Sequence, residues 1–485
     1  MPTPKDQEPE DKDSGLFYLR LLLGALAFYT VYQNYFPIEF TIPGLNIFNC
    51  MFLGVLFIAM YKGIHSKESP PAKGAFTFLF VMVTWGFLVG VIDDSTTAMA
   101  DLVEFKTSLF YILMYYLYYR AVQDIKTIRL VLAVVLFTAF LAQLQAVRQG
   151  LDYGLGNFNE TRRAAGPFGS AARANSCAAY FVIMVPVGAA CMLEFKRGWK
   201  VFLMLLFSVG MGVFGLFVTY SRQGYFILGL ILLYLTFRKS LVLALCLCGF
   251  LACYQLWAPD AMIQRIEMTK QDEDAKPGKD GEAPKYDEST ESRFLIWDGA
   301  FRMMGERPLG VGLNHFKRNI GKYEPRYAGY DAHNNYIRMA AEATPIASLA
   351  MIFIIIRLFI LGIQVERVDR SDASRALGLS MQAAAIGVLM SNFYGSRFFD
   401  GDVTGSVWIL AALAARYRQI KLDAQALRAP VVDDTPPWVR AAAQRSAAQA
   451  APAVPAVPTA LAGPTGPASL PHGGPPDGRA GGRPV

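Results

Sequence analysis

Residues 331–363 have the sequence DAHNNYIRMAAEATPIASLAMIFIIIRLFILGI, in which a polar segment passes directly into a long apolar run. The apolar run is long enough, as a helix, to cross about 30 Å of hydrocarbon. The polar segment closes a stretch from Ala258 to Glu342 that lies between two such runs and contains two of the chain's four histidines. These features predict a membrane protein that holds one large, partly helical polar loop at a membrane face.

Similar apolar runs recur along the chain. The 485 residues are 53% hydrophobic and 18% charged, which excludes an ordinary soluble enzyme. The runs predict an all-α polytopic fold with about 12 transmembrane helices. The first run extends from Gly15 to Phe36, and the others centre near Phe52, Val83, Leu113, Leu136, Val185, Phe207, Leu230, Cys248, Phe353, Ala385 and Leu410.

Basic residues mark alternate loops and predict the orientation in the membrane. The loops Pro37–Gly44 and Asp93–Asp101 contain no Lys or Arg. We therefore expect both termini to be cytoplasmic and the large polar stretch to face outward. The basic residues assigned to the cytoplasmic side are Lys62, Lys67, Lys73, Arg120, Lys126, Arg129, Lys196, Arg197, Lys200, Arg238, Lys239, Arg367, Arg370, Arg375, Arg416, Arg418 and Lys421.

The ends of the chain differ in composition from its middle. Residues 1–14 form an acidic leader, and residues 15–428 contain all the apolar runs. Residues 429–485 hold 12 of the 27 prolines among Ala and Gly. Such a composition cannot bury a core, so we expect a disordered cytoplasmic tail.

Charge and cysteine content exclude several classes of function. The net charge of +7 is explained by the basic loops, so we expect no nucleic-acid partner. All six cysteines fall within or beside apolar runs, where they are expected to be small apolar fillers. Paired cysteines in polar loops, which a disulfide or a zinc site would need, do not occur.

Two outward segments contain arginines that depart from the positive-inside pattern. Arg162 and Arg163 lie in the loop Asn159–Gly169, and Arg222 lies in the tight turn Val218–Tyr225. Each can be a residue that only touches lipid headgroups or water. Alternatively, the guanidinium groups form a site for phosphate, whose oxygens match their geometry.

The large polar stretch contains two informative parts. After a charged segment, Lys270–Lys285, which we expect to be a mobile surface segment, Ser289 or Thr290 can cap a helix over Glu291–Met304. Arg293 begins this helix, beside an apolar face. That predicted face consists of Phe294, Trp297, Phe301 and Met304.

The second part is the head of the membrane run that follows. His333 stands there with two asparagines and a tyrosine, where a polar lipid head would lie. It can be a helix cap or a hydrogen-bonded surface residue, or it can act on a substrate. Arg338 and Glu342 are four residues apart and are expected to pair on one helix face.

Together these residues resemble the superfamily of O-antigen ligases and polymerases. The resemblance lies mainly between Ser221 and about Leu361, and is weaker at Gly166-Pro167-Phe168 and Asn175. One departure is Thr344-Pro345, where the family often has a glycine; proline is tolerated in the first turn of a helix. The matching residues are Ser221-Arg222-Gln223-Gly224, then Arg293, Trp297, Ala300, Met304, Pro308, Gly310 and Gly312, and then His333-Asn334-x-Tyr336 with Glu342.

The resemblance implies a glycosyltransferase of the bacterial inner membrane that works on the periplasmic face. Its expected partners are a glycan donor on undecaprenyl diphosphate, a lipid A-core acceptor and the bilayer. A leaving diphosphate needs a metal or fixed cations. The only compact acidic run in the outward loops, Asp272-Glu273-Asp274, lies in the mobile segment, so we expect no metal and no cofactor.

Arginines are then the candidates for the diphosphate, and a neutral imidazole for the base. Direct attack by the acceptor hydroxyl predicts inversion at the anomeric carbon. We expect His333, Arg222 and Arg293 to be catalytic. The residues expected to bind substrate are Arg162, Arg163, Asn175, Ser221, Gln223, Asn334, Tyr336 and Arg338.

Three functions remain possible from the sequence. The first is an O-antigen ligase. The second is a relative with the same donor chemistry, either a repeat-unit polymerase or a transferase to protein Ser/Thr. The third is a transporter, which predicts an internal repeat and ionisable residues deep in the spans; no repeat is visible, and Glu104 with Lys106 is the one notable cluster.

Overall fold

The computed structural model describes residues 8–36, 46–66, 68–155, 158–194, 198–267 and 288–428, with short pieces at 439, 441–442 and 445–446. The expected loop Pro37–Gly44, the segment Lys270–Lys285 and most of the expected tail lie outside the described residues, as do Lys67, Lys196 and Arg197. The chain divides into two units, Met1–Arg428 and Ala429–Val485. Everything below concerns the first unit.

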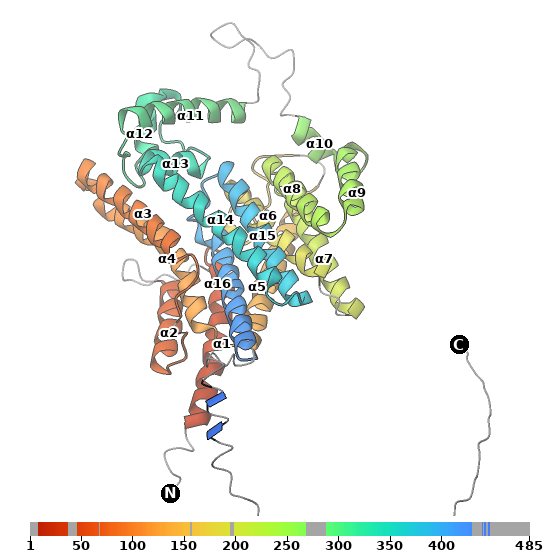
Figure 1. Cartoon of the computed structure of the whole chain (residues 1–485). Coiled ribbons are helices and arrows are strands. Elements are labelled where there is room, and N and C mark those ends of the chain that lie inside the picture. The colour runs from red at the N-terminus through yellow and green to blue at the C-terminus, as the bar shows by residue number, and fades with distance from the viewer. Residues whose placement is uncertain are drawn as a thin grey trace, which may run out of the picture. The chain divides into compact units, whose positions relative to one another are not determined.

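The described residues of this unit form α-helices and short 3-10 turns, without a strand (Figure 1). The all-α prediction is therefore confirmed. The helices are α1 Glu8–Tyr32, α2 Ile47–Tyr61, α3 Lys73–Asp93, α4 Ala98–Ala121, α5 Ile125–Tyr153, α6 Ala174–Glu194, α7 Gly198–Phe217, α8 Arg222–Lys239, α9 Leu241–Ala252, α10 Asp260–Glu267, α11 Glu288–Glu306, α12 Phe316–Tyr323, α13 Asn335–Glu342, α14 Pro345–Arg367, α15 Asp372–Phe393 and α16 Gly401–Ala426.

Every centre predicted for a membrane span lies on one of these helices. In the described part of the chain, seven helices are long and apolar enough to cross a membrane: α1, α3, α5, α6, α7, α14 and α15. Two others, α2 and α9, are apolar but shorter. The chain is thus a multi-pass membrane protein, while the expected count of twelve crossings stays a prediction.

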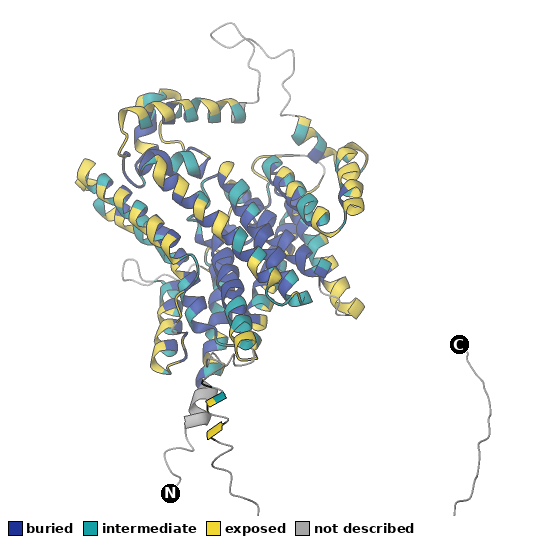
Figure 2. Ribbon diagram, in the orientation of Figure 1, coloured by how far each residue is buried: buried dark blue, intermediate teal, exposed yellow. Residues whose placement is uncertain are grey.

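The interior of the bundle is built around α6 and α15, which are the most buried of the seven candidate spans (Figure 2). Both helices are rich in small residues, which allow helix backbones to approach closely. A Cβ added to Gly387 would lie 3.2 Å from the Cα of Ile183, and one added to Gly378 would lie 2.6 Å from the carbonyl oxygen of Gly362. Only glycine fits these two contacts without a shift of the neighbouring helix.

The large polar stretch forms a second, smaller core outside the bundle. Helices α11, α12 and α13 pack together around Ile296, Ala300, Phe316 and Ile320. A turn between α11 and α12 joins this cap to α3: the Leu313 amide donates to the Gly86 carbonyl over 2.8 Å. The cap therefore has apolar packing of its own and a fixed attachment to the bundle.

Two members of the apolar face predicted for α11, Trp297 and Met304, pack against the core of the cap. Ile296, Ala300 and Met303 are fully buried, whereas Phe294 and Phe301 are half exposed. The helix packs against α12 and α13, partners that its own periodicity could not reveal. It also begins at Glu288, so Ser289 and Thr290 lie inside its first turn and do not cap it.

By contrast, the start of α14 agrees with the sequence. Thr344 is the N-cap, and its hydroxyl accepts the amide of Ala347 over 3.3 Å. Pro345 lies in the first turn, where its missing N–H costs no intrahelical hydrogen bond. Replacing the family's usual glycine by Thr-Pro thus changes only how this helix begins.

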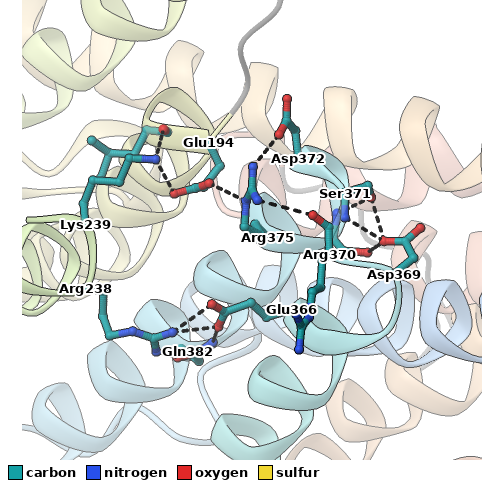
Figure 3. Close-up of polar contacts among 12 residues, drawn as sticks. Glu194, Arg238, Lys239, Glu366, Asp369, Arg370, Ser371, Asp372, Arg375 and Gln382 are labelled. Carbon is teal, nitrogen blue, oxygen red and sulfur yellow. Dashed lines mark hydrogen bonds and ion pairs between the residues drawn. The ribbon is translucent and has the colours of Figure 1, made fainter.

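Basic loops gather at one end of the bundle, where they are tied by ion pairs (Figure 3). Glu194 accepts from Lys239 and from Arg375, each over 2.8 Å. Arg238 pairs with Glu366 over 2.8 Å, in contact with Gln382. The loops that share one side in the sequence prediction thus meet in space, opposite the cap.

All six cysteines are free. Cys177 and Cys191 are buried in α6 and fill space there, as expected. Cys50, Cys246, Cys248 and Cys253 are exposed, so the expectation of a filler role fails for these four. They lie on or beside α2 and α9, the two short apolar helices.

Candidate functional site

The segment that carries Arg163 is anchored on both sides. The Ala164 amide donates to the carbonyl of Val218 over 3.0 Å, which fixes the segment against the turn after α7. On the other side, the side-chain oxygen of Gln149 in α5 accepts the amides of Ala165 and Gly166 over 3.0 and 2.8 Å. A half-buried glutamine thus holds the loop just where its short 3-10 turn, Gly166–Phe168, begins.

Arg163 joins this loop to α6 and to the turn before α8. Its Nε donates to the Thr219 carbonyl over 2.9 Å and its Nη2 to Oδ1 of Asn175 over 2.7 Å. Burial and the guanidinium of Arg265, with a further contribution from Arg222, lower the pKa of Arg163 below its usual value. The group still carries its charge. Two further guanidinium groups thus act on that of Arg163, and the carboxylate of Glu160 partly offsets their charge.

Arg265 was not predicted from the sequence. It lies on α10, with its guanidinium 4.1 Å from the centre of the Phe158 ring and 3.8 Å from Glu160. Its side chain is only 15% exposed. In the sequence, the one sign of its role was the position of an arginine in the outward stretch next to an apolar helix. Its partners Phe158 and Glu160 lie more than a hundred residues earlier in the chain.

The start of α8 is the second element of this cluster. Tyr220 adopts φ +50°, which turns the chain sharply before Ser221 in the N-cap position. The Ser221 hydroxyl and the Gln223 side-chain oxygen are buried and make no hydrogen bond to a described residue. The first amides of a helix lack intrahelical acceptors and favour anions. Polar groups without acceptors or donors thus collect at this helix end.

A small cavity of ≈ 10 Å³ joins the start of α8 to the start of α6. Asn175, Gln223 and Arg397 are among the residues that line it. Arg397 lies in the turn between α15 and α16 and pairs with Asp400 over 3.1 Å. The sequence did not single it out, because it stands in a short turn outside the large polar stretch.

His333 occupies a tightly held turn before α13. Its backbone has φ +50°, and its amide donates to Oδ1 of Asp331 over 2.9 Å. The same oxygen accepts the Ser396 hydroxyl over 2.6 Å, and the indole of Trp297 donates to the Ala332 carbonyl over 2.8 Å. Groups from α11 and from the turn after α15 therefore hold the backbone of this turn, while the His333 side chain is exposed.

The surroundings of His333 are mainly cationic. Partial desolvation lowers its pKa below the usual value; Asp331 opposes this, and Arg293, Arg397 and Lys317 add to it. The pKa of Asp331 is itself lowered: burial raises it, but Arg338, Ser396 and the His333 amide outweigh burial. The imidazole is consequently neutral over more of the physiological range than an ordinary histidine.

Two predicted groups thus converge at the same end of the bundle. Arg163, Arg222 and Asn175 form one group, and His333 with Arg293 forms the other. Arg397 belongs to both, because it lines the cavity beside Asn175 and acts electrostatically on His333. Arg162 is exposed, and its side chain makes no contact with either group among the described residues.

Three other predicted residues serve the fold around this site. The Asn334 side chain caps α13 by accepting the amides of Tyr336 and Ile337. The Tyr336 hydroxyl donates to the Leu389 carbonyl over 2.9 Å, which ties α13 to α15. Arg338 pairs with Glu342 over 3.1 Å, as expected, and lies 3.3 Å from Glu104 and 3.8 Å from Asp331. Three carboxylates thus engage Arg338.

The second histidine of the polar stretch has a buried partner that the sequence did not suggest. His315 Nε2 lies 2.9 Å from Oδ2 of Asp101, and both side chains are almost fully buried. The Thr97 hydroxyl donates to the same carboxylate oxygen over 2.7 Å. This contact joins the start of α4 to the cap, 214 residues further along the chain.

Asp101→Ala should destabilise the protein by about 2 kcal/mol, because the buried His315 would lose its carboxylate partner. Thermal unfolding of the purified protein in detergent measures the effect. Asp152→Ala is the matched control, since Asp152 is 66% exposed and faces Arg148 at 3.9 Å. Equal melting temperatures for both variants would contradict a stabilising role for the His315 contact.

Among the described residues, no three His, Cys, Asp or Glu side chains come together as a metal site would require. A comparison with known protein families indicates the class of protein. Residues 207–343 match the O-antigen ligase family. This confirms the resemblance seen in the sequence.

The O-antigen ligase match begins in α7 and ends between α13 and α14. It spans less than a third of the chain and includes Arg222, Arg265, Arg293 and His333. Arg163 and Asn175 lie before it, yet pack against it. The match supports a ligase- or polymerase-type glycosyltransferase that acts on lipid-linked glycans. No curated protein matches the chain.

Proposed function

We propose that the protein transfers a glycan from undecaprenyl diphosphate to a sugar hydroxyl of lipid A-core, on the periplasmic face of the inner membrane. The observation that carries this proposal is the meeting of half-buried arginines and a histidine with a lowered pKa at one end of the bundle, largely within the O-antigen ligase match. The transfer is direct and inverting, and it uses fixed cations where other transferases use a metal.

In this proposal the diphosphate binds at the mouth between α6 and α8. Arg163, Arg222 and Arg265 surround it, and the first turns of both helices direct amide N–H groups toward it. Cleavage of the glycosidic bond leaves growing negative charge on the diphosphate oxygen. Guanidinium groups already held in place stabilise that charge without reorganising. Burial strengthens each contact relative to water.

His333 then accepts the proton of the acceptor hydroxyl as this oxygen attacks the anomeric carbon. The new carbon–oxygen bond forms as the bond to the diphosphate breaks, so configuration inverts and no covalent enzyme intermediate forms. Arg293 and Arg397 both act electrostatically on His333, and Arg397 also lines the cavity beside Asn175. They would neutralise charge on the side of the diphosphate that faces the acceptor.

The rate of glycan transfer should depend on pH, and the cations near His333 should set the pH at which activity is lost. A base must be unprotonated, so activity is lost as the pH falls through the pKa of His333. Arg397 helps to lower that pKa. Arg397→Gln should therefore move the acid limb of the pH–rate profile of kcat/KM to higher pH. An acid limb that stays in place, or moves to lower pH, would contradict this assignment.

The expected membrane arrangement belongs to the same proposal. Helices α4, α8 and α16 fall short of the apolar criterion, but charged residues such as Asp101, Arg120, Arg238 and Asp402 stand near their ends. With α2 and α9 they complete twelve crossings, which places both termini in the cytoplasm and the cap in the periplasm. The membrane domain then spans residues 15–428, between the leader 1–14 and the tail 429–485.

Deletion of the protein in its host, followed by gel analysis of lipopolysaccharide, tests the choice of acceptor. A ligase predicts loss of all O-chains from lipid A-core, with full-length polymer accumulating on the carrier. A single repeat left on lipid A-core would instead identify a polymerase. Normal lipopolysaccharide with an unglycosylated protein would identify a transferase to protein Ser/Thr.

A further inference from the structure

A second cavity lies at the end of the bundle opposite the cap, and its volume is ≈ 290 Å³. One face of α5 forms a wall, with Ile128, Leu132 and Leu136 at helical spacing. Ala373 and Leu377 of α15 are part of the opposite side. The lining is mainly aliphatic, so the cavity suits a hydrocarbon chain and not a polar metabolite.

The cavity reaches the outer surface of the bundle. Among its lining residues, Arg129 and Ala133 are exposed, whereas a closed cavity would have a buried lining throughout. Two of the helices that form it, α5 and α15, are candidate membrane spans. The exposed lining residues therefore lie on the outside of a helix that is long and apolar enough to cross a membrane.

Arg129 gives this cavity one charged edge. It lies about one turn inside α5, and it makes no hydrogen bond or ion pair with any described residue. Lys126, three residues earlier, is its neighbour on the helix surface and is exposed. Two adjacent cations thus stand at the rim of an apolar cavity.

Several acidic residues in the described part of this end pair with other cations (Figure 3). Glu194 accepts from Lys239 and Arg375, and Arg375 also contacts Asp372 over 2.5 Å. Asp124 pairs with Arg20 over 2.9 Å, and Asp369 with Lys421 over 2.7 Å. None of these carboxylates therefore pairs with Arg129 among the described residues, and its charge stands at the rim of the cavity.

We propose that this cavity is a binding site for an anionic phospholipid. One acyl chain occupies the space between α5 and α15, and the lipid phosphate binds Arg129, with Lys126 beside it. The site lies at the opposite end of the bundle from His333, in the other leaflet. It does not depend on the proposed transfer reaction, only on the membrane-spanning fold.

Native mass spectrometry of the purified full-length protein in detergent tests this proposal. Equal amounts of phosphatidylglycerol and phosphatidylcholine are added, and the lipid retained is identified. The wild-type protein should retain phosphatidylglycerol about tenfold over phosphatidylcholine. The phosphate of phosphatidylglycerol carries a net negative charge that can pair with Arg129, whereas choline neutralises the phosphate of phosphatidylcholine. Arg129→Gln should bring that ratio close to one.

Arg418→Gln is the matched control, since Arg418 lies at the same end, has no described partner and does not line the cavity. It should leave the ratio unchanged. Ala133→Leu, which fills the cavity, should reduce retention of both lipids, and gel filtration confirms that each variant is folded. Wild-type selectivity in Arg129→Gln would overturn the proposal, as would equal retention of both lipids by the wild-type protein.

Discussion

His333→Ala is expected to lower glycan transfer at least about 100-fold while the protein still inserts and folds. The imidazole lies among cations that lower its pKa, and Asp331 and Trp297 hold its turn by contacts to the backbone. Those contacts do not involve the imidazole, so the substitution removes the base and leaves the turn. Transfer by purified protein, with lipid-linked donor and acceptor, measures the effect.

His65→Ala is a suitable control for this prediction. His65 is also exposed, but it lies in a loop at the opposite end, where Nδ1 is 3.3 Å from the Ala59 carbonyl. Its replacement should leave transfer unchanged. Substantial transfer by His333→Ala would remove His333 from the mechanism and would point to a base supplied by the substrate.

Single replacement of Arg222 or Arg163 by Ala should lower turnover by about 100-fold to 1,000-fold. Each arginine contributes to a cluster that stabilises charge on the leaving diphosphate, and buried cations contribute more than exposed ones. Arg163→Lys should not restore activity, because one ammonium cannot hold the Thr219 carbonyl and Asn175 in the way a guanidinium does. Donor titration and turnover measured on the same samples separate binding from chemistry.

Arg148→Ala is the matched control for the arginine cluster. Arg148 stands near the end of α5 on the same side of the bundle, but it is 83% exposed and faces only Asp152 at 3.9 Å. We expect its replacement to change little, since exposed ion pairs contribute weakly. Unchanged donor affinity together with unchanged turnover in Arg222→Ala and Arg163→Ala would refute their assignment to the leaving group.

Hydropathy was enough to predict where the helices of the bundle lie, and seven of them are long and apolar enough to cross a membrane in the described part of the chain. Each predicted centre, from Phe52 to Leu410, falls on a helix, because apolar length is a local property of the sequence. Alternation of the loops then brings Arg163, Arg222 and His333 to one end without knowledge of any contact. The presence of these three residues at one end of the bundle could therefore be predicted from the topology.

The parts of the fold and of the site that depend on packing between helices could not be predicted from the sequence. Arg265 joins the cluster by stacking on Phe158, and His315 meets Asp101 across 214 residues of chain. Helical spacing on α11 suggested Phe294 and Phe301 as the buried face, but α12 and α13 cover Ile296 instead. In each case the deciding neighbour comes from another helix, and a single sequence carries no signal for that pairing.

Donor binding and single-turnover transfer, measured side by side on purified full-length protein, test most directly how the arginines and His333 divide the reaction. For His333→Ala, we predict wild-type affinity for the undecaprenyl-diphosphate donor and no transfer of the bound glycan. For Arg222→Ala, we predict that both donor affinity and transfer fall. If His333→Ala instead binds donor poorly but transfers what it binds at the wild-type rate, then His333 binds the donor and is not the base.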